Sequence, residues 1–454
     1  MSDSTSMGGV SRERIAAFYE TERARYRRER PASHAAATES GFYSGVPLHW
    51  MLDWPMPYPL VVARAQGAML TDIDGIEHVD FCLGDTGSMF GHAPEPVVRA
   101  IREQSARGIA FMLPTEDSIA CGRLLAERFG LPLWQIATTA SDANRFALRV
   151  ARAVTDRPKI LVMNGCYHGA VDETYVALKD GRAINQPALI GQFTDLTQET
   201  QVVEFNDLAG LETALLGRDV ACVITEPVLT NCCMVLPEAG YHEGLRQLTR
   251  SYGTLLLIDE THTISSGPRG YTGAYGLEPD IFVLGKPIAG SIPTSAWGFT
   301  AEIAEAWSRV TREKPSGHSG LGTTLSANAL SMAAMRAVLT EVMTDAAYAH
   351  MENMAERLAD GLARAIGAAD LPWHVARVGA RVEFICAPGP LKNGSEARRA
   401  QVPPLERAVH VGLVNRRCLI APFHNMMLVC PATTRSQVDQ LISAFTEITQ
   451  ALVA

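Results

Sequence analysis

Three polar side chains follow three apolar runs that have the length of buried strands. Glu226, Asp259 and Lys286 come at the ends of these runs. In an open parallel sheet, ligands bind beyond the carboxyl ends of the strands, so we expect the three side chains to share one crevice. A carboxylate after a strand is by itself more often only the cap of the next helix. A lysine there has no solvated face, and burying it unpaired would be costly, so the three together favour a reactive site.

A run of small and polar residues at 138–144 opens a predicted helix. Ser141 or Asp142 is a good N-cap, and the free N–H groups and positive dipole of a helix start favour a phosphate. The sequence has neither GxGxxG nor GxxxxGK[ST], so a Rossmann dinucleotide site and a P-loop have no support. This run is a candidate phosphate site only together with the three strand ends.

Lysine, aspartate, a phosphate cradle and an aromatic ring together are what pyridoxal phosphate (PLP) requires. The lysine amine forms a Schiff base with the aldehyde, and the carboxylate keeps the pyridine nitrogen protonated, so that the ring draws electrons. Tyr167, which follows another strand end, would cover the ring. Lys286 and Asp259 are therefore the predicted Schiff-base lysine and ring-nitrogen partner.

The elements that must position these residues alternate along the middle of the chain. Short, continuously apolar runs between helices indicate strands covered on both faces, hence a mostly parallel α/β sheet. From residue 326 a long helical region and later strand candidates suggest a second, smaller α+β domain. The predicted helices are 118–129, 143–154, 241–252, 326–341 and 346–366, and the predicted strands are 159–163, 220–224, 254–258, 281–284, 375–385 and 426–430.

The N-terminal segment joins a charged helix to an irregular strap. The pattern predicts one helix over Ser11 to Arg30, and the four prolines of residues 45–59 forbid regular structure there. We expect residues 1–75 to join the small domain, residues 76–325 to form the large PLP-binding domain, and residues 326–454 to form the small domain.

Composition narrows the class of protein. The 454 residues carry a net charge of −9, which disfavours general binding to nucleic acid or an anionic membrane. No apolar run approaches the ~20 residues of a membrane helix, and no secretory signal is evident. The nine cysteines lack CxxC spacing, so we expect buried thiols, no metal site and a cytoplasmic location.

In the strand-end residues and the helix start described above, the chain resembles the class III aminotransferases of PLP fold type I, especially the branch of glutamate-1-semialdehyde aminomutase and β-amino-acid transaminases. The resemblance runs from about residue 60 to the C-terminus. The motifs that carry it, in order, are Asp72-Ile73-Asp74-Gly75, Val79-Asp80-Phe81, Gly91-His92, Thr139-Ala140-Ser141-Asp142-Ala143, Ala147-Leu148-Arg149-Val150-Ala151-Arg152, Tyr167-His168-Gly169, Glu226-Pro227, Ile258-Asp259-Glu260, Pro279-Asp280, Gly285-Lys286 and Thr324-Leu325-Ser326-Ala327-Asn328.

The resemblance implies a role for each matched residue. Lys286 would carry the Schiff base and move protons, and Asp259 would pair with the ring nitrogen. Thr324 would reach the phosphate held by a neighbouring subunit, which implies a homodimer with shared active sites. The other implied cofactor-binding residues are Ala140, Ser141 and Asp142 at the phosphate, Tyr167 and His168 at the ring, Thr261 behind it where relatives carry valine, and Glu226 near Asp259.

Two departures from the family pattern bear on the substrate. The arginine that usually follows the Asp-Glu-Val motif is missing, and Leu48-His49-Trp50 stands where aminomutases have a carboxylate-clamping arginine. Arg381, Arg416 and Arg417 are weak candidates for a replacement clamp. Aromatic residues of the entrance segments either line an apolar pocket or only pack the strap. These are Trp50, Trp54, Tyr58 and Phe90.

The leading function is therefore a PLP-dependent aminotransferase that exchanges an amino group between an amine or an amino acid, α or β, and a keto acid or aldehyde. The apolar pocket predicts bulky or aryl amines and β-amino acids as better substrates than glutamate-1-semialdehyde. The alternatives are an intramolecular aminomutase, a PLP-fold lyase and a non-catalytic binding protein. Retention of both Lys286 and Asp259 argues against the last.

Overall fold

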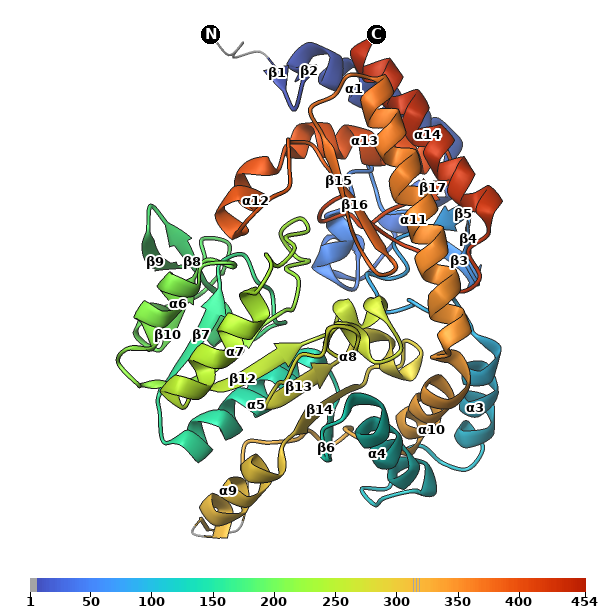
Figure 1. Ribbon diagram of the computed structural model, residues 1–454. Coiled ribbons are helices and arrows are strands. Elements are labelled where there is room, and N and C mark those ends of the chain that lie inside the picture. The colour runs from blue at the N-terminus through green and yellow to red at the C-terminus, as the bar shows by residue number, and fades with distance from the viewer. Residues whose placement is uncertain (1–5, 313, 316, 318) are drawn as a thin grey trace. The chain divides into compact units, whose positions relative to one another are not determined.

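The computed structural model describes residues 6–454 except 313, 316 and 318. It divides into two compact units (Figure 1). Unit 1 comprises residues 1–94, 346–390 and 400–454, and unit 2 comprises residues 95–345 and 391–399. These limits differ from the predicted ones at 75/76 and 325/326. Residues 77–80 belong to a sheet of unit 1, and the helix at 329–337 packs on other helices of unit 2, so both limits lie later in the chain.

Unit 2 is built on a seven-stranded sheet in the order β10-β7-β11-β12-β13-β14-β6. Among these strands only β14 runs antiparallel to its neighbours, as expected of a mostly parallel α/β sheet. Their bounds are β6 Leu133–Ala137, β7 Lys159–Met163, β10 Thr200–Val203, β11 Val220–Thr225, β12 Leu255–Asp259, β13 Ile281–Leu284 and β14 Ser295–Phe299, and a separate hairpin comprises β8 Val176–Lys179 and β9 Arg182–Asn185.

The helices predicted in unit 2 are present, the one at 241–252 with the predicted limits and the others with different ends, and further helices of unit 2 were not predicted. The helix predicted over 326–341 is α10 followed by a single π-helical turn at Val338–Val342, because its regular hydrogen bonding stops at Ala337. The bounds are α3 Glu95–Ser105, α4 Glu116–Phe129, α5 Ala140–Thr155, α6 Leu208–Leu215, α7 Tyr241–Tyr252, α8 Gly270–Tyr275, α9 Ala301–Arg312, α10 Ala329–Ala337 and α12 Gly394–Ala400.

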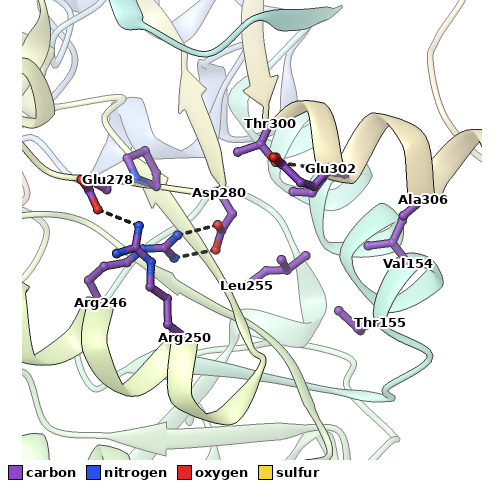
Figure 2. Close-up of a pocket in the computed structure, with 12 residues that line it drawn as sticks. Val154, Thr155, Arg246, Arg250, Leu255, Glu278, Asp280, Thr300, Glu302 and Ala306 are labelled. Carbon is purple, nitrogen blue, oxygen red and sulfur yellow. Dashed lines mark hydrogen bonds and ion pairs between the residues drawn. The ribbon is translucent and has the colours of Figure 1, made fainter.

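At the amino ends of the strands, α7 is fastened to the sheet by an ion pair. Both guanidinium nitrogens Nη1 and Nη2 of Arg246 lie 2.7 Å from the carboxylate of Asp280, which immediately precedes β13 (Figure 2). The same carboxylate accepts a hydrogen bond from the backbone N–H of Leu256 in β12. One aspartate thus joins a helix and two strands.

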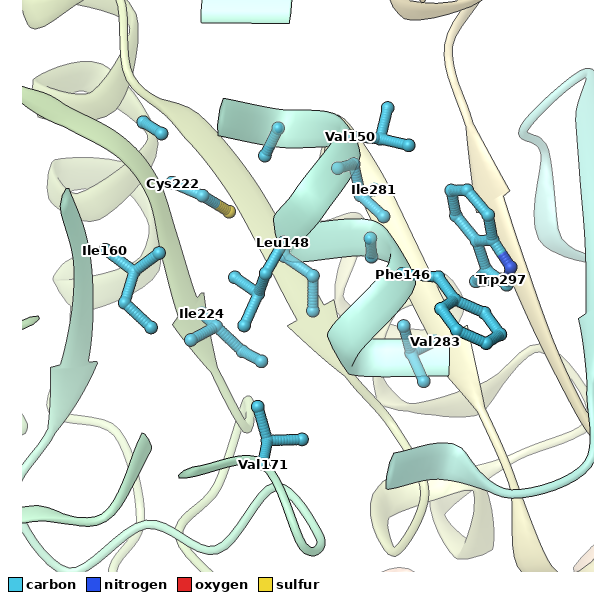
Figure 3. Packing of buried hydrophobic residues seen from close by; sticks show 14 of the residues in the cluster. Phe146, Leu148, Val150, Ile160, Val171, Cys222, Ile224, Ile281, Val283 and Trp297 are labelled. Atoms are coloured by element: carbon cyan, nitrogen blue, oxygen red, sulfur yellow. The ribbon is translucent and has the colours of Figure 1, made fainter. Parts of the chain in front are cut away.

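The core of unit 2 lies between α5 and the sheet. Phe146, Leu148 and Val150 of α5 are buried, and Figure 3 shows them over strand residues such as Ile224 and Val283. Burying apolar side chains of this size contributes roughly 1.5–3 kcal/mol each. This packing fixes the start of α5 beside the carboxyl ends of the strands, where the predicted site residues are.

Unit 1 contains two small sheets and a group of helices. The sheets have the orders β17-β5-β4-β3 and β15-β16-β18. The strands are β3 Val62–Gln66, β4 Met69–Asp72, β5 Glu77–Asp80, β15 His374–Val378, β16 Arg381–Ile385, β17 Cys418–Leu419 and β18 Met426–Leu428, with a short pair β1 Ser6–Met7 and β2 Val10–Ser11; the helices are α1 Arg12–Glu29, α2 Pro31–Thr38, α11 Asp345–Ala368, α13 Pro403–Asn415 and α14 Arg435–Val453.

The N-terminal helix and strap have the predicted character. Helix α1 ends at Glu29, and Pro31 is the first residue of α2, a position where its missing N–H costs nothing. The proline-rich stretch contains only short 3₁₀ turns, Tyr43–Gly45 and His49–Leu52. Among the described residues, no helix is both long enough and apolar enough to cross a bilayer.

Candidate active site

Asp259 is the last residue of β12 and is only 4% exposed. Its Oδ2 accepts a hydrogen bond from Asn144 Nδ2 at 2.8 Å and lies 3.0 Å from His168 Nδ1. Its Oδ1 accepts from the backbone N–H of Thr261 at 3.1 Å and from the Thr261 hydroxyl at 2.6 Å. Four groups from three segments therefore hold this carboxylate in one orientation.

The surroundings of Asp259 keep it ionised. Burial acts to raise the pKa of Asp259, but the hydrogen bond and charge of His168, with those from Thr261 and Asn144, lower the pKa below its usual value. Burial acts to lower the pKa of His168, and Cys166 and Asp259 raise it well above the usual value. A buried carboxylate that stays charged at the end of a strand can bind a cationic ring nitrogen.

Lys286 begins a 3₁₀ turn, Lys286–Ala289, directly after β13. Its φ is +47°, a left-handed conformation that costs a non-glycine residue on the order of 1–3 kcal/mol. Gly285 before it has no room for a side chain, because a Cβ there would lie 2.7 Å from the Cβ of Ala140. This close approach sets Lys286 beside the start of α5, and its Nζ lies 2.5 Å from Nε2 of His262.

The start of α5 differs in one detail from the prediction. The N-cap is Thr139, not Ser141 or Asp142, because the Thr139 hydroxyl accepts the backbone N–H of Asp142 at 3.1 Å. The N–H groups of Ala140 and Ser141 belong to the first turn, where no intrahelical acceptor exists. The Ser141 hydroxyl accepts from the N–H of Ala170 at 2.9 Å. Helix start and hydroxyl together suit an anion.

Glu226 lies within electrostatic reach of Asp259 and His168, but its hydrogen bonds go to other groups, and its orienting role stays a prediction. It is 3% exposed, and its carboxylate accepts hydrogen bonds from the N–H of Thr230 at 3.1 Å, the Thr230 hydroxyl at 2.5 Å and Asn231 Nδ2 at 3.1 Å. Burial raises the pKa of Glu226, although His168, Thr230 and Asn231 act to lower it. Through Thr230, Glu226 is linked to His262 rather than hydrogen-bonded to Asp259.

Two further predicted residues lie near the site without a demonstrated role in it. Tyr167 is half-buried and meets Tyr175 edge to face, with ring centroids 6.4 Å apart. Thr324 is exposed, whereas its neighbour Thr323 hydrogen-bonds Thr138 after β6 at 2.8 Å. Stacking of Tyr167 on a cofactor and service of Thr324 to a second subunit stay predictions.

The candidate substrate residues Leu48, Trp50 and Phe90 all belong to unit 1. Leu48 is 46% exposed, Trp50 meets the ring of Phe423 at 5.7 Å, and Phe90 is buried against Tyr348. Their contact with a substrate stays a prediction. The other two aromatics of the strap have the packing role that we considered as the alternative: Trp54 and Tyr58 pack in a cluster with Tyr26, Leu70, Val414 and Leu419.

The three candidate clamp arginines have partners inside unit 1. Arg416 forms ion pairs with Glu22 and Glu447, and Arg417 lies 3.4 Å from Glu29. Arg381 is fully buried and hydrogen-bonds Thr86. None of the three is therefore a ready replacement for the missing arginine.

Asn144, Thr230 and His262 are site residues that the sequence analysis missed. Asn144 is a polar residue on the buried face of α5, and that pattern could have identified it. Thr230 and His262 lie in segments of irregular sequence whose side-chain contacts no periodicity reveals. Within the described residues, no cluster of three or more His, Cys, Asp or Glu side chains could hold a metal ion, and all nine cysteines are thiols.

The residues present fit pyridoxal phosphate. An ionised, buried carboxylate stands at one strand end and a lysine at the next, and the first turn of α5 offers backbone N–H groups between them. Gly285 and Gly169 let their backbone segments approach the start of α5 closely, since a Cβ on Gly285 would meet Ala140 and a Cβ on Gly169 would clash with Ser141. Sheet order and site together define an α/β enzyme of PLP fold type I.

Comparison with known proteins agrees. The family model "Aminotransferase class-III" matches residues 53–451, and the chain belongs to this family, whose cofactor is PLP. A glutamate-1-semialdehyde 2,1-aminomutase of Desulforudis audaxviator is 34% identical over 86% of this chain and 90% of its own. A second, of an Anaeromyxobacter species, is 36% identical over 75% of this chain and 79% of its own.

Solved structures give the same result. A glutamate-1-semialdehyde aminomutase from Pseudomonas aeruginosa PAO1 superposes with a TM-score of 0.96 at 46% identity, over 98% of this chain and all of the other. The K286A variant of that protein has been solved in complex with PMP. An omega-transaminase from Sphaerobacter thermophilus superposes with a TM-score of 0.86 at 28% identity, over 94% of this chain and 99% of the other. The relatives' names favour the aminomutase alternative over the transaminase prediction.

Proposed function

We propose that this chain holds PLP at Lys286 and moves an amino group from one carbon of a small substrate to another. When bound, PLP supplies an electron-withdrawing ring that stabilises negative charge on the carbon that loses a proton. Asp259 supports that ring by keeping its nitrogen protonated, and the pKa of this buried carboxylate is low enough for the task. The first turn of α5, with Ala140, Ser141 and Asp142, binds the phosphate.

Lys286 has two tasks in this proposal. Its amine holds the cofactor between turnovers, and once released it would take a proton from the substrate carbon that loses the amino group and give one to the carbon that gains it. The left-handed backbone and the absence of a side chain at Gly285 fix where Nζ can reach. A relative supports this role of the lysine. The Pseudomonas aeruginosa aminomutase was solved as a K286A variant, and its chain covers nearly the whole length of this one.

The first candidate reaction is that of a glutamate-1-semialdehyde 2,1-aminomutase. The observation that carries it is the 46% identity, over 98% of this chain, to a solved structure of that name. In such a reaction the amino group leaves carbon 2 and enters carbon 1 of the same molecule, so no second substrate is consumed.

The second candidate is transfer between two molecules, from an amine or β-amino acid to a keto acid or aldehyde. It is favoured by Leu48-His49-Trp50, because the loop offers no arginine for a substrate carboxylate, and a bidentate contact of that kind is a strong one. A lyase and a non-catalytic binding protein have no specific observation in their favour.

We further propose a homodimer in which Thr324 of one subunit serves the phosphate held by the other. Its support is the exposure of Thr324 in its own chain. A cytoplasmic location would suit the buried thiols.

Attachment of the cofactor is tested by borohydride. The purified protein should be yellow, and reduction should leave a pyridoxyl group on Lys286 alone, which peptide mass spectrometry locates. Label on another lysine would overturn the assignment. Lys286→Ala should lose turnover and retain PLP, because the contacts to the phosphate and ring nitrogen do not depend on the lysine.

The two candidate reactions are separated by substrate. Glutamate-1-semialdehyde is supplied with no other amine or carbonyl compound, and appearance of the product with its amino group on carbon 1 supports the aminomutase. An aryl amine with a keto acid tests the transaminase. The ratio of kcat/KM for the two decides: tenfold in favour of the semialdehyde ends the transaminase proposal, and tenfold against it ends the aminomutase proposal.

A further inference from the structure

A series of side-chain contacts leads from Lys286 through His262 and Thr230 to Glu226. The Nζ of Lys286 lies 2.5 Å from Nε2 of His262, and Nδ1 of His262 lies 2.9 Å from the hydroxyl of Thr230. That hydroxyl donates to Glu226 at 2.5 Å. His262, Thr230 and Glu226 are at most 5% exposed. The reaction as described uses only the lysine at one end of this series.

The direction of each hydrogen bond fixes the form of the histidine. The Thr230 hydroxyl has one proton, and that proton goes to Glu226. Towards His262 the hydroxyl can only accept, so Nδ1 of His262 must carry a proton and donate it. In a neutral imidazole the other nitrogen then has a free lone pair. Nε2 therefore presents an acceptor to the amino group of Lys286.

The loop that carries Thr230 is held independently of His262. Leu229 and Val235 form two backbone hydrogen bonds with each other, at 3.1 and 3.0 Å, and the N–H of Thr230 donates to Glu226. Asn231 gives a further hydrogen bond to the same carboxylate. Thr230 thus stays in place when the lysine side chain moves.

We propose that His262 is a catalytic base and acid for Lys286, with Thr230 and Glu226 as its positioning residues. When Lys286 must act as a free amine, one proton passes from its ammonium group to Nε2 of His262, which becomes an imidazolium while Nδ1 keeps its proton on Thr230. The reverse transfer restores the ammonium. No other reactant is needed, and the charge of the pair stays at one.

The other ionisable groups near this pair have separate tasks. Asp259 and His168 face each other at the ring-nitrogen position, and Glu260 accepts hydrogen bonds from the backbone N–H groups of Tyr271 and Thr272 and from the Thr263 hydroxyl. Glu226 reaches His262 only through Thr230. His262 is in direct contact with the lysine amine.

The inference rests on the proposed role of Lys286, and its test uses capture of PLP by the cofactor-free protein rather than turnover. Protein stripped of cofactor is mixed with PLP at pH values from 5 to 9, quenched with borohydride at timed intervals, and the pyridoxyl label on Lys286 is quantified by mass spectrometry. The wild-type rate should change with pH as the Lys286–His262 pair loses its proton. His262→Gln should lose that step and capture PLP at least about tenfold more slowly at pH 7.

A pair of variants at Thr230 keeps the test decisive if the histidine variant does not fold. Thr230→Val removes the acceptor for Nδ1–H and should slow capture by about threefold or more, whereas Thr230→Ser keeps the hydroxyl and should stay close to wild type. His242→Gln is the matched control, since His242 is another histidine beside this loop whose Nε2 lies 2.9 Å from the carbonyl of Pro227. It should leave the pH profile unchanged.

The outcomes separate the two claims. If the label is on Lys286 and the pH profile is the same in wild type, His262→Gln and Thr230→Val, His262 is only a packing residue and the inference fails while the proposed function stands. If no label appears on Lys286 in the wild type, the proposed function itself fails.

Discussion

The charged side chains at the amino ends of the unit 2 strands have different partners from those at the carboxyl ends. At the amino ends, Arg246 meets Asp280 and Arg250 meets Glu278, each at 2.7 Å, around a cavity of about 490 Å³ (Figure 2). At the carboxyl ends, Asp259 is held by an amide, a hydroxyl, a backbone N–H and one imidazole. The first arrangement is an ion pair complete within the chain, whereas the second contains the carboxylate that we propose as the partner of a ring nitrogen.

The partners of a buried carboxylate distinguish a structural ion pair from a candidate binding site. An aspartate paired side-on with a guanidinium, as Asp280 is, has a cation on both oxygens and offers little to a second cation. In Asp259 one oxygen is held by a hydroxyl and a backbone N–H, which are neutral donors, so this carboxylate retains attraction for a further cation. A cavity beside the first kind of aspartate is therefore a weaker candidate than the crevice beside the second.

Asp259→Asn, at the carboxyl end of β12, should give the largest effect of the four substitutions. The amide keeps the shape but not the charge that supports a protonated ring nitrogen. We expect the first half-reaction with an amino donor to slow by several orders of magnitude, roughly 4 kcal/mol or more of lost transition-state stabilisation, in rapid-mixing absorbance measurements. A near-normal rate would show that another group supports the ring nitrogen.

Glu260→Gln tests the ionisation of the buried carboxyl group next to Asp259. Burial raises the pKa of Glu260 from 4.5 to about 7, although the hydrogen bonds of Thr272, Tyr271 and Thr263 act to lower it. The native protein therefore binds a proton that the unfolded chain has lost, so the contribution of this carboxyl to stability is complete below about pH 4.5 and is lost as the pH rises through about 7. The loss is about 3 kcal/mol.

The glutamine variant cannot ionise, so its free energy of unfolding should fall less than that of wild type between pH 4.5 and 7. Urea titrations of both proteins at several pH values measure the difference. Parallel curves would mean that Glu260 is ionised in the native protein throughout this range.

Asp280→Asn tests the amino end. Loss of the charge leaves the half-buried guanidinium of Arg246 with a neutral partner, and we expect about 2 kcal/mol of lost stability. Activity per folded molecule should be unchanged, because the pair is satisfied within the chain. A variant with normal urea unfolding but lost turnover would show that the amino ends of the strands have a function. The ion pair of Asp280 would then not be purely structural.

Ser141→Ala should give the smallest effect. It removes the hydroxyl that accepts from the N–H of Ala170 and that we place at the phosphate, while the helix start remains. We expect PLP to dissociate with about fivefold weaker affinity, near 1 kcal/mol, measured by the loss of absorbance on dialysis. Ser141→Thr, which keeps the hydroxyl, is the control; equal affinities in all three proteins would remove Ser141 from the phosphate site.

Much of unit 2 could be predicted from the sequence because its strands are short, uniformly apolar and bounded. The strands at 159–163 and 281–284 and the helix at 241–252 have the predicted limits, and the strand ends identified Asp259 and Lys286 as candidates. The limits of the two units could not be predicted, because they depend on which sheet β5 joins and on a short return of the chain at 391–399.

The residues that surround the candidates were harder to predict for a physical reason. Thr230 and His262 meet only because two irregular segments fold towards each other, and Thr139 caps α5 because the helix begins three residues earlier than its apolar pattern. Hydrophobic periodicity reports burial and not the direction of a hydroxyl or an imidazole. Side-chain hydrogen bonds therefore required the structure.

The pairing of β5 with β17 has a consequence for how the protein is made. Cys418 lies opposite Val79, about 340 residues further along the chain. Bringing such distant segments together is entropically slow. Strands β3, β4 and β5 must therefore wait, with one edge of their sheet incomplete, until nearly the whole polypeptide has been synthesised. During this interval the nascent chain is exposed to aggregation and most needs a chaperone.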